Sequence, residues 1–126
     1  MCEKIFTGLD RFQISELSSL GELRLGVCCH PAAVDQHLTG LPKLLQESAV
    51  PVTRWFAPEH GLLGQLQDME ACFSDSSQVI SLYGTHADSL HPPAESVADL
   101  DVLLFDLRDI GTRYYTFAAT LRYLLE

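Results

Sequence analysis

Residues 101–106, with the sequence Asp-Val-Leu-Leu-Phe-Asp, constrain the fold of this chain more than any other segment. The four consecutive apolar residues do not alternate with polar ones, although a strand with one solvent-exposed face would show that alternation. Such a run is typical of a strand that is covered on both faces in a parallel sheet. We therefore expect a parallel sheet that carries helices on both of its faces.

The other strands of this sheet are predicted from shorter apolar runs that end near glycine or proline. They span residues 23–29, 50–56 and 79–83. One or two short helices are predicted before the first strand, in residues 8–20. Further helices are predicted between the strands, from about Leu41 with Pro42 in the first turn, and within residues 91–98. A last helix is predicted to start at an N-cap Thr112, with an apolar stripe of Tyr114, Phe117, Ala118, Leu121 and Leu124.

Strands that alternate with helices predict an α/β fold, here a doubly wound, mainly parallel sheet with flanking helices that are joined by right-handed crossovers. The length of 126 residues is sufficient for one domain with its own core, so we expect a single domain over residues 1–126. Ligands of such sheets bind outside the carboxyl ends of the strands. That edge is therefore where we expect the functional residues.

The charge balance argues against nucleic acid or an anionic membrane as a partner. The chain carries 17 acidic residues and 8 lysines and arginines, a formal net charge of −9, and the basic residues are spread along the sequence. The N-terminal residues lack the apolar stretch of a signal peptide. The cysteines, which are Cys2, Cys28, Cys29 and Cys72, show no Cys-x-x-Cys spacing and are expected to be reduced thiols. A cytoplasmic location is the expectation.

Polar side chains follow three of the predicted strands at their carboxyl ends. His30 follows the first strand, Glu59 and His60 follow the second, and the fourth strand ends in Asp106 and continues to Arg108 and Asp109. If these strands are neighbours, the side chains converge on one edge of the sheet, which is where α/β proteins bind ligands. We therefore predict a site at this edge.

The residue types at this edge allow several roles, and the sequence leaves them open. Glu59, between Pro58 and Gly61, could be a general acid or could cap the following turn. His60 could orient Glu59, contact a ligand or fill a polar corner. Asp106 could be a second carboxylate or could accept hydrogen bonds from loop N–H groups.

The segment that leads from Asp109 into the predicted last helix is a candidate anion site. Arg113 could bind an anionic ligand there or pair with Asp109, and Tyr115 could stack on a sugar ring. No Gly-x-Gly-x-x-Gly, phosphate loop or His-Glu-x-x-His occurs in the sequence, so neither a cofactor nor a metal is expected. A metal-dependent hydrolase that uses His60, Asp106 and Asp109 is a third and less supported hypothesis.

Four blocks, in this order, resemble one known family, the NamZ-type exo-β-N-acetylmuramidases, formerly a conserved domain of unknown function. They are residues 26–35, Phe-Ala-Pro-Glu-His-Gly at 56–61, Ser-Leu-Tyr-Gly at 81–84, and residues 101–116. Members of the family are longer, and the resemblance implies that this chain is their Rossmann-like N-terminal domain. Their C-terminal domain, which completes the cleft, is absent from residues 1–126.

The resemblance implies hydrolysis of terminal β-1,4-linked N-acetylmuramic acid at the non-reducing end of peptidoglycan fragments, as in peptidoglycan recycling of the cell wall. Glu59 is then the candidate catalytic acid and Asp106 a candidate second carboxyl group. His30, His60, Arg108, Asp109, Arg113 and Tyr115 are then candidate contacts to a sugar or muropeptide substrate.

The chain departs from the family pattern at two positions on the predicted edge. The family usually has Asn at the position of His30 and Gln at the position of Arg108. These departures motivate an alternative function, a catalytically silent domain that binds a sugar or muropeptide. In either case we expect little or no turnover by these 126 residues alone, because half of the cleft is missing.

Overall fold

The computed structural model describes residues 5–12, 22–59, 61–62 and 79–126. Four parallel strands form one sheet with the order β3-β2-β1-β4: β1 (Leu25–Cys29), β2 (Arg54–Ala57), β3 (Val79–Ser81) and β4 (Val102–Asp106). The helical segments are α1 (Gly8–Arg11), α3 (Leu41–Glu47), the 3-10 helix η1 (Ala87–Leu90), α4 (Ala94–Val97) and α5 (Phe117–Leu125). The fold is therefore the predicted α/β, Rossmann-like arrangement of a parallel sheet with flanking helices.

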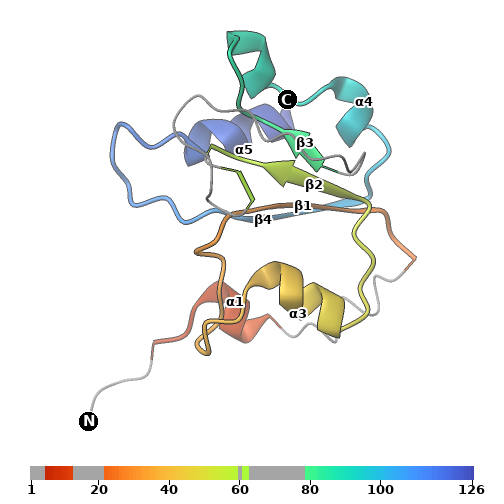
Figure 1. The fold of residues 1–126 in the computed structure, drawn as a ribbon, viewed down its shortest axis with the longest axis vertical. Helices are drawn as coiled ribbons and strands as arrows, with labels where there is room; N and C mark the ends of the chain where they lie inside the picture. The colour runs from red at the N-terminus through yellow and green to blue at the C-terminus, as the bar shows by residue number, and fades with distance from the viewer. Residues whose placement is uncertain (1–4, 13–21, 60, 63–78) are drawn as a thin grey trace.

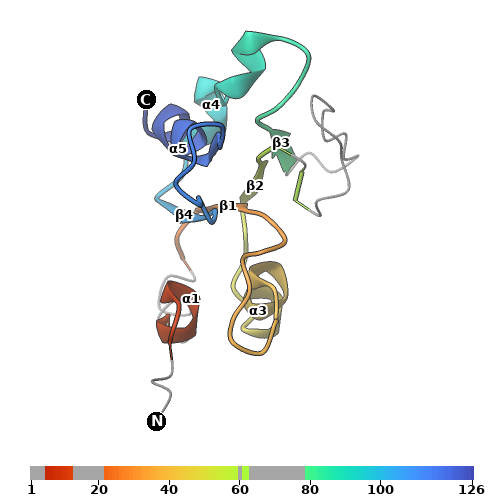
Figure 2. The same ribbon diagram turned by 90° about the vertical axis from the view of Figure 1, so that its left-hand side faces the viewer.

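The sheet lies between two layers of helices. Helices α1 and α3 pack on one face, and α4 and α5 pack on the other (Figure 1). The view along the strands shows the same three layers, with β4 at one edge of the sheet (Figure 2). In the order β3-β2-β1-β4 the direction of chain progression reverses between β1 and β4, and the crevice at such a switch point is where these sheets bind ligands.

The core has two halves, one on each face of the central strand β1, whose five residues are all buried. Leu25, Val27 and Cys29 point toward α3 and pack with Leu41 and Leu45. Cys28 points to the opposite face, where its cluster contains Phe56, Leu82 and Leu124. Adjacent cysteines on opposite faces follow from the two-residue period of a strand.

Both thiols in β1 are buried and free, which removes them from the list of reactive groups. Burial raises the pKa of Cys29 to about 12, with a smaller contribution from the negative charge of Asp106. Burial is also the main reason why the pKa of Cys28 lies far above its ordinary value. A thiol that stays protonated is a poor nucleophile and a poor metal ligand, so these residues serve the core.

Local sequence signals explain where helices α1 and α3 begin. Thr7 caps α1, since its hydroxyl accepts a hydrogen bond from the N–H of Asp10 while the Asp10 carboxylate accepts from the N–H of Thr7. Helix α3 starts at Leu41 with Pro42 in its first turn, as predicted, and buries Leu41 and Leu45.

The predicted second strand starts four residues too early. Residues 50–53 lie outside β2, which begins at Arg54. Ala49 has a positive φ of 54°, and its turn redirects the chain from α3 toward the sheet before pairing with β1 begins at the register Gly26 to Arg54. The apolar side chains of Val50 and Val52 still pack into the core on the α3 side. The apolar run at residues 50–53 therefore indicates burial and not pairing with another strand.

The predicted last helix also starts too early. Thr112 is not its N-cap, because α5 begins at Phe117 with Thr116 as the cap residue. Gly111 has a φ of 75°, and the N–H of Tyr115 bonds to the carbonyl of Thr112 in a separate turn. Tyr114 consequently lies in the loop and is 90% exposed. The buried residues of α5 are Phe117, Thr120 and Leu124.

Strand β4 contacts apolar side chains on both faces, as its composition predicted. Val102 and Leu104 pack with the α3 side of the core, while Leu103 and Phe105 pack with the other side. All five residues are nevertheless only half-buried, because β4 is an edge strand among the described strands. The residues that the structure describes include no helix long and apolar enough to cross a membrane.

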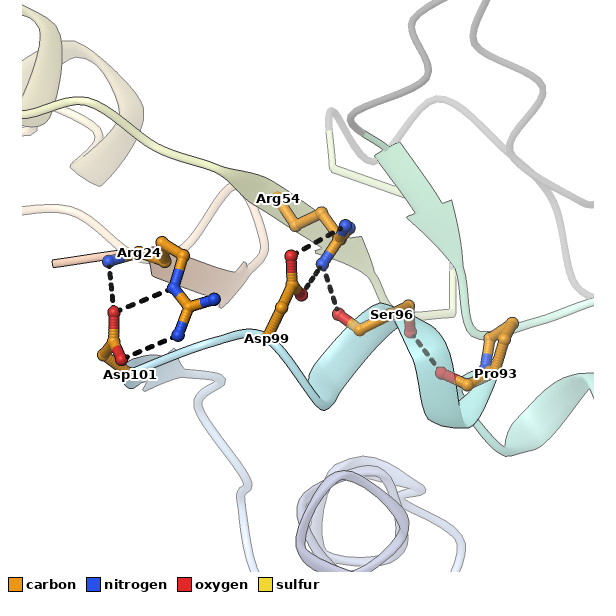
Figure 3. Close-up of polar contacts among 6 residues, drawn as sticks. All are labelled: Arg24, Arg54, Pro93, Ser96, Asp99 and Asp101. Carbon is orange, nitrogen blue, oxygen red and sulfur yellow. Dashed lines mark hydrogen bonds and ion pairs between the residues drawn. The ribbon is translucent and has the colours of Figure 1, made fainter.

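Two arginine–aspartate pairs close the amino ends of the strands (Figure 3). Both oxygens of Asp101 accept hydrogen bonds from Arg24, at 3.1 Å from Nε and 3.0 Å from Nη2, and one also accepts from the Arg24 N–H at 2.9 Å. Arg54 pairs with Asp99, and its Nη1 donates to the carbonyl of Ser96 at 2.9 Å. The charges at this end therefore hold the loop after α4 against β1 and β2.

The Asp101 pair makes stability depend on pH in a defined direction. Hydrogen bonds from Arg24 lower the pKa of Asp101 from 3.8 to about 2. A depressed folded-state pKa contributes stability above the unfolded value and loses it as the pH falls through the folded value. We expect Asp101→Asn to lower the urea midpoint above about pH 4, and the difference from wild type to shrink toward pH 2.

Asp88→Asn is the matched control, because Asp88 is exposed and its carboxylate has no ion pair among those found in the described part of the chain. Urea unfolding followed by circular dichroism at a series of pH values measures the effect. A difference between Asp101→Asn and wild type that stays constant from pH 6 to pH 2 would show that the ion pair is not its source.

Candidate functional site

The carboxyl ends of the strands carry the polar residues that the sequence pointed to. His30 directly follows β1, Glu59 lies two residues after β2, and Asp106 is the last residue of β4. The register pairs Cys29 with Asp106, so the ends of β1 and β4 lie next to each other at the switch point. The loops after these two strands, which continue to α3 and α5, form the edge at which a ligand would bind.

A histidine joins the two loops across the switch point. The Nδ1 of His30 accepts a hydrogen bond from the N–H of Ala32 at 2.9 Å, and its Nε2 accepts from the N–H of Arg108 at 3.1 Å. A neutral imidazole has one acceptor nitrogen, so the ring satisfies one of these donors at a time. Its ring also lies 5.0 Å from that of Phe117 at the start of α5. His30 therefore ties β1, the loop after β4 and α5 together.

Glu59 is presented by a tight turn whose ends are fixed. Pro58 is fully buried, and its carbonyl accepts a hydrogen bond from the N–H of Gly61 at 2.9 Å. Gly61 has a φ of 75°, a conformation that favours glycine, and this confirms the prediction that the chain turns away here. Glu59 itself is half-buried, and its Oε2 accepts a hydrogen bond from the hydroxyl of Thr116 at 2.9 Å.

Asp106 and Arg108 lie on the other face of the sheet. Leu104, two residues before Asp106, faces α1 and α3, so the two-residue period directs the Asp106 side chain to the same face. Arg108 Nε is 3.7 Å from Asp106 Oδ1, and Arg108 Nη2 donates to the carbonyl of Val34 at 3.1 Å. Arg108 thereby holds the loop after β1. It also contributes to the lowered pKa of Asp10, which is mainly due to the hydrogen bond from the N–H of Thr7.

A cavity of about 560 Å³ opens on this second face, beside the edge strand β4. Its apolar wall comes from α1, α3 and β4, and its polar groups include Asp106 and Arg108. The residues that line it are Thr7, Gly8, Leu9, Phe12, Leu41, Leu104, Phe105, Asp106 and Arg108. This cavity is thus lined by Asp106 and Arg108 and not by Glu59.

The remaining predicted residues occupy the loop between β4 and α5. The Oδ1 of Asp109 accepts a hydrogen bond from the N–H of Gly111 at 2.7 Å, which shapes the turn. Arg113 is exposed and does not form the alternative ion pair with Asp109 among the contacts of the described residues. Tyr115 is 43% exposed and its ring packs edge-on against Phe117 at 5.3 Å. The loop reaches the N-terminus of α5 at Phe117 and not at Thr112, so Arg113 lies before the helix, and an anion site there stays a prediction.

The structure therefore separates the side chains of five predicted residues into two groups. Glu59, His30 and Tyr115 are connected through the start of α5, by way of Thr116 and Phe117. Asp106 and Arg108 lie with α1 and α3. His60 lies outside the described residues. Within the part of the chain that the structure describes, no group of three or more histidine, cysteine or carboxylate side chains could hold a metal ion.

Sequence reasoning missed one residue that contacts a candidate catalytic group. Thr116 donates to Glu59 across 57 positions of sequence. In the sequence it is only the last residue of a family-like block, and no spacing rule connects it to Glu59. The helix pattern misplaced the start of α5, and the correct start would have pointed to Thr116 as a residue at a helix end facing the strand edge.

Comparison with known proteins identifies the family. The model of the N-terminal part of the exo-β-N-acetylmuramidase NamZ matches residues 25–126. The chain belongs to this family. The peptidoglycan β-N-acetylmuramidase NamZ of Bacillus subtilis (strain 168) is 31% identical, and the match covers 98% of this chain and 30% of that protein.

A solved structure confirms the fold independently of the family model. The crystal structure of a DUF1343 family protein from Bacteroides fragilis superposes with a TM-score of 0.75 at 31% identity. The match covers 94% of this chain and 30% of that structure. The chain thus spans about a third of the length of these two proteins, and it matches the N-terminal family model.

Proposed function

We propose that this chain forms one wall of the active site of an exo-β-N-acetylmuramidase, a glycoside hydrolase that removes terminal β-1,4-linked N-acetylmuramic acid from peptidoglycan fragments. The observation that carries the proposal is the placement of Glu59 in a NamZ-family chain. Glu59 stands at the carboxyl end of a parallel sheet, on a turn fixed by Pro58 and Gly61, with its carboxylate oriented by Thr116.

Glu59 is assigned the role of general acid. It protonates the glycosidic oxygen, the bond from that oxygen to the anomeric carbon breaks with its electron pair left on the oxygen, and water adds to the anomeric carbon. Asp106 stays a prediction for the second carboxyl group that most glycosidases use. Its side chain lies on the face opposite to the start of α5, so it would act only on a substrate that extends past the edge of β4.

The proposal includes a second wall from outside residues 1–126. A hollow of about 90 Å³ borders Thr116 and α5, and it is too small to enclose a disaccharide, since ligand pockets usually measure about 300–1,000 Å³. The relatives are about three times as long as this chain. We propose that a further domain completes the cleft and that the protein acts in the cytoplasm.

A second candidate function is a silent domain that binds muropeptides without cleaving them. The observation in its favour is the location of His30 and Arg108, the two departures from the family pattern, on either side of the switch point. Both side chains make internal hydrogen bonds, so they shape the edge of the sheet and need not contact the sugar. Calorimetry with N-acetylmuramic acid and with a muropeptide tests this candidate, since it requires binding without turnover.

The proposed reaction is tested with the full-length gene product and two disaccharides. N-acetylmuramic acid linked β-1,4 to N-acetylglucosamine should be cleaved, with free N-acetylmuramic acid detected by mass spectrometry. The disaccharide with the reverse order of sugars should stay intact, because an exo-muramidase requires N-acetylmuramic acid at the non-reducing end. Cleavage of both at similar rates would contradict the assigned specificity, and binding without cleavage would favour the second candidate.

A further inference from the structure

We propose that Thr116 is the positioning residue of Glu59, and that its hydroxyl determines which oxygen of the carboxyl group carries the transferable proton. This inference rests on the proposed function and goes beyond it, because it assigns a role to a residue outside the predicted catalytic and binding sets. The contact is specific: the Thr116 hydroxyl donates to Oε2 of Glu59 at 2.9 Å, from an element 57 residues away.

Thr116 uses its hydroxyl in an unusual way for its position. It is the N-cap residue of α5, where a threonine side chain ordinarily accepts a hydrogen bond from an N–H of the first helical turn. Here its backbone is helical, with φ −99° and ψ −6°, and no such bond forms. The chain therefore gives up a stabilising cap while the hydroxyl bonds to Glu59, a local inconsistency of the kind that occurs at functional sites.

The neighbours of Thr116 hold it in place on both sides. Phe117 is buried and its ring contacts His30 at 5.0 Å, which fixes the start of α5 against β1. One turn later, Thr120 is buried, and both its N–H and its hydroxyl donate to the carbonyl of Thr116. A donor on so constrained a backbone can orient a carboxyl group because its own position varies little.

The two oxygens of a neutral carboxyl group differ, and this difference determines what the hydrogen bond from Thr116 does. In the neutral acid, one oxygen is a carbonyl acceptor and the other carries the proton. Donation from Thr116 to Oε2 makes Oε2 the acceptor, so the proton resides on Oε1. When Oε1 gives this proton to the glycosidic oxygen, Glu59 becomes a carboxylate and Thr116 continues to donate to Oε2. Water loses one proton when its oxygen adds to the anomeric carbon, and this proton balances the one that Glu59 gave to the glycosidic oxygen.

Thr116→Val tests the role, because valine has the shape of threonine without the hydroxyl. We expect kcat for an aryl β-N-acetylmuraminide to fall by about 10- to 100-fold with KM nearly unchanged, since misplacing a reacting group by about 1 Å costs on the order of 100-fold. Thr116→Ser retains the donor and should recover most of kcat. The control is Thr53→Val, which removes a half-buried hydroxyl at the amino end of β2, the opposite end of the strand from Glu59, and should leave kcat unchanged.

The outcomes separate this inference from the proposed function. If Glu59→Gln retains wild-type kcat, the acid assignment fails. If Glu59→Gln is inactive while Thr116→Val retains wild-type kcat, the positioning role alone fails. Equal losses in Thr116→Val and Thr116→Ser would also overturn it, because the hydroxyl would then not be the cause.

A readout without turnover tests the contact itself. Thermal unfolding is compared for Thr116→Val, Glu59→Ala and the double variant. Since the two side chains share one hydrogen bond, we expect the double variant to lose less in Tm than the sum of the single losses. Additive losses would show that the two residues do not interact.

Discussion

Replacing Glu59 with glutamine is expected to lower kcat for release of N-acetylmuramic acid from an aryl β-glycoside by about 10²–10⁴-fold, the usual contribution of a general acid. Glutamine has nearly the same shape, and its amide oxygen can still accept the hydrogen bond from Thr116. The variant therefore removes the transferable proton and leaves the turn between Pro58 and Gly61 in place. Steady-state kinetics measure the loss of kcat on the full-length gene product, with KM determined separately.

The matched control is Glu95→Gln, which removes a carboxylate from the exposed first turn of α4 on the same side of the sheet. It should retain wild-type kcat. Wild-type kcat in Glu59→Gln would contradict the assignment of the catalytic acid, whatever the control shows. Equal losses in both variants would indicate a general effect of charge on the protein.

Gly26→Ala is expected to destabilise the fold by about 1–3 kcal/mol, the usual cost of overpacking a core. Gly26 is the second residue of β1, and a side chain there would point to the face of the sheet that α4 and α5 cover. A Cβ atom there would lie 2.6 Å from Leu100 Cδ1 and 3.1 Å from both Leu103 Cδ1 and Phe56 Cε2. These neighbours come from β2, from β4 and from the segment before β4, so no single side chain can relieve the contact. Urea unfolding followed by circular dichroism measures the change.

Gly8→Ala is the control for this substitution. Gly8 is exposed in α1, and a Cβ atom there would meet nothing within 4 Å. Alanine should therefore be neutral or slightly stabilising, because it favours a helix over glycine by roughly 1 kcal/mol at most. A Gly26→Ala protein as stable as wild type would mean that β1 packs less tightly than the contacts around Gly26 indicate.

The sequence predicted the fold where local chemistry determines it. The apolar run of β4, the proline at the start of α3, and the proline and glycine around Glu59 each identify an element or a turn from neighbouring residues alone. The start of α5 was predicted wrongly because Gly111 and the turn from Thr112 to Tyr115 interrupt a stripe that looks helical. The edge position of β4 depends on strand order, which no local pattern encodes.

The candidate site was predicted in part for the same reason. The carboxyl ends of the strands follow from the fold class, so His30, Glu59 and Asp106 were placed at the correct edge. The face on which each side chain lies was not considered, although the two-residue period from Leu104 would have placed Asp106 on the α1 side. The hydrogen bond from Thr116 to Glu59 joins distant segments and became visible only in three dimensions.

The contacts of Glu59 differ from those of the aspartates at the amino ends of the strands. At the amino ends, Arg24 and Arg54 pair with aspartates and fix the loop after α4. At the carboxyl end, Glu59 has a neutral hydroxyl as its described partner and remains half-buried. The charges at the amino ends therefore serve stability, whereas the Glu59 carboxylate forms no ion pair with any of the described residues.

A crystal structure of the Glu59→Gln protein with the disaccharide of N-acetylmuramic acid β-1,4-linked to N-acetylglucosamine tests the central claim most directly. Our account predicts that the sugar binds at the carboxyl end of β2, with the side-chain amide introduced at position 59 within about 2.6–3.2 Å of the glycosidic oxygen. The same amide should still accept a hydrogen bond from Thr116. A sugar that binds instead in the cavity between α1 and β4, on the face of Asp106 and Arg108, would contradict the assignment of Glu59 as the catalytic acid.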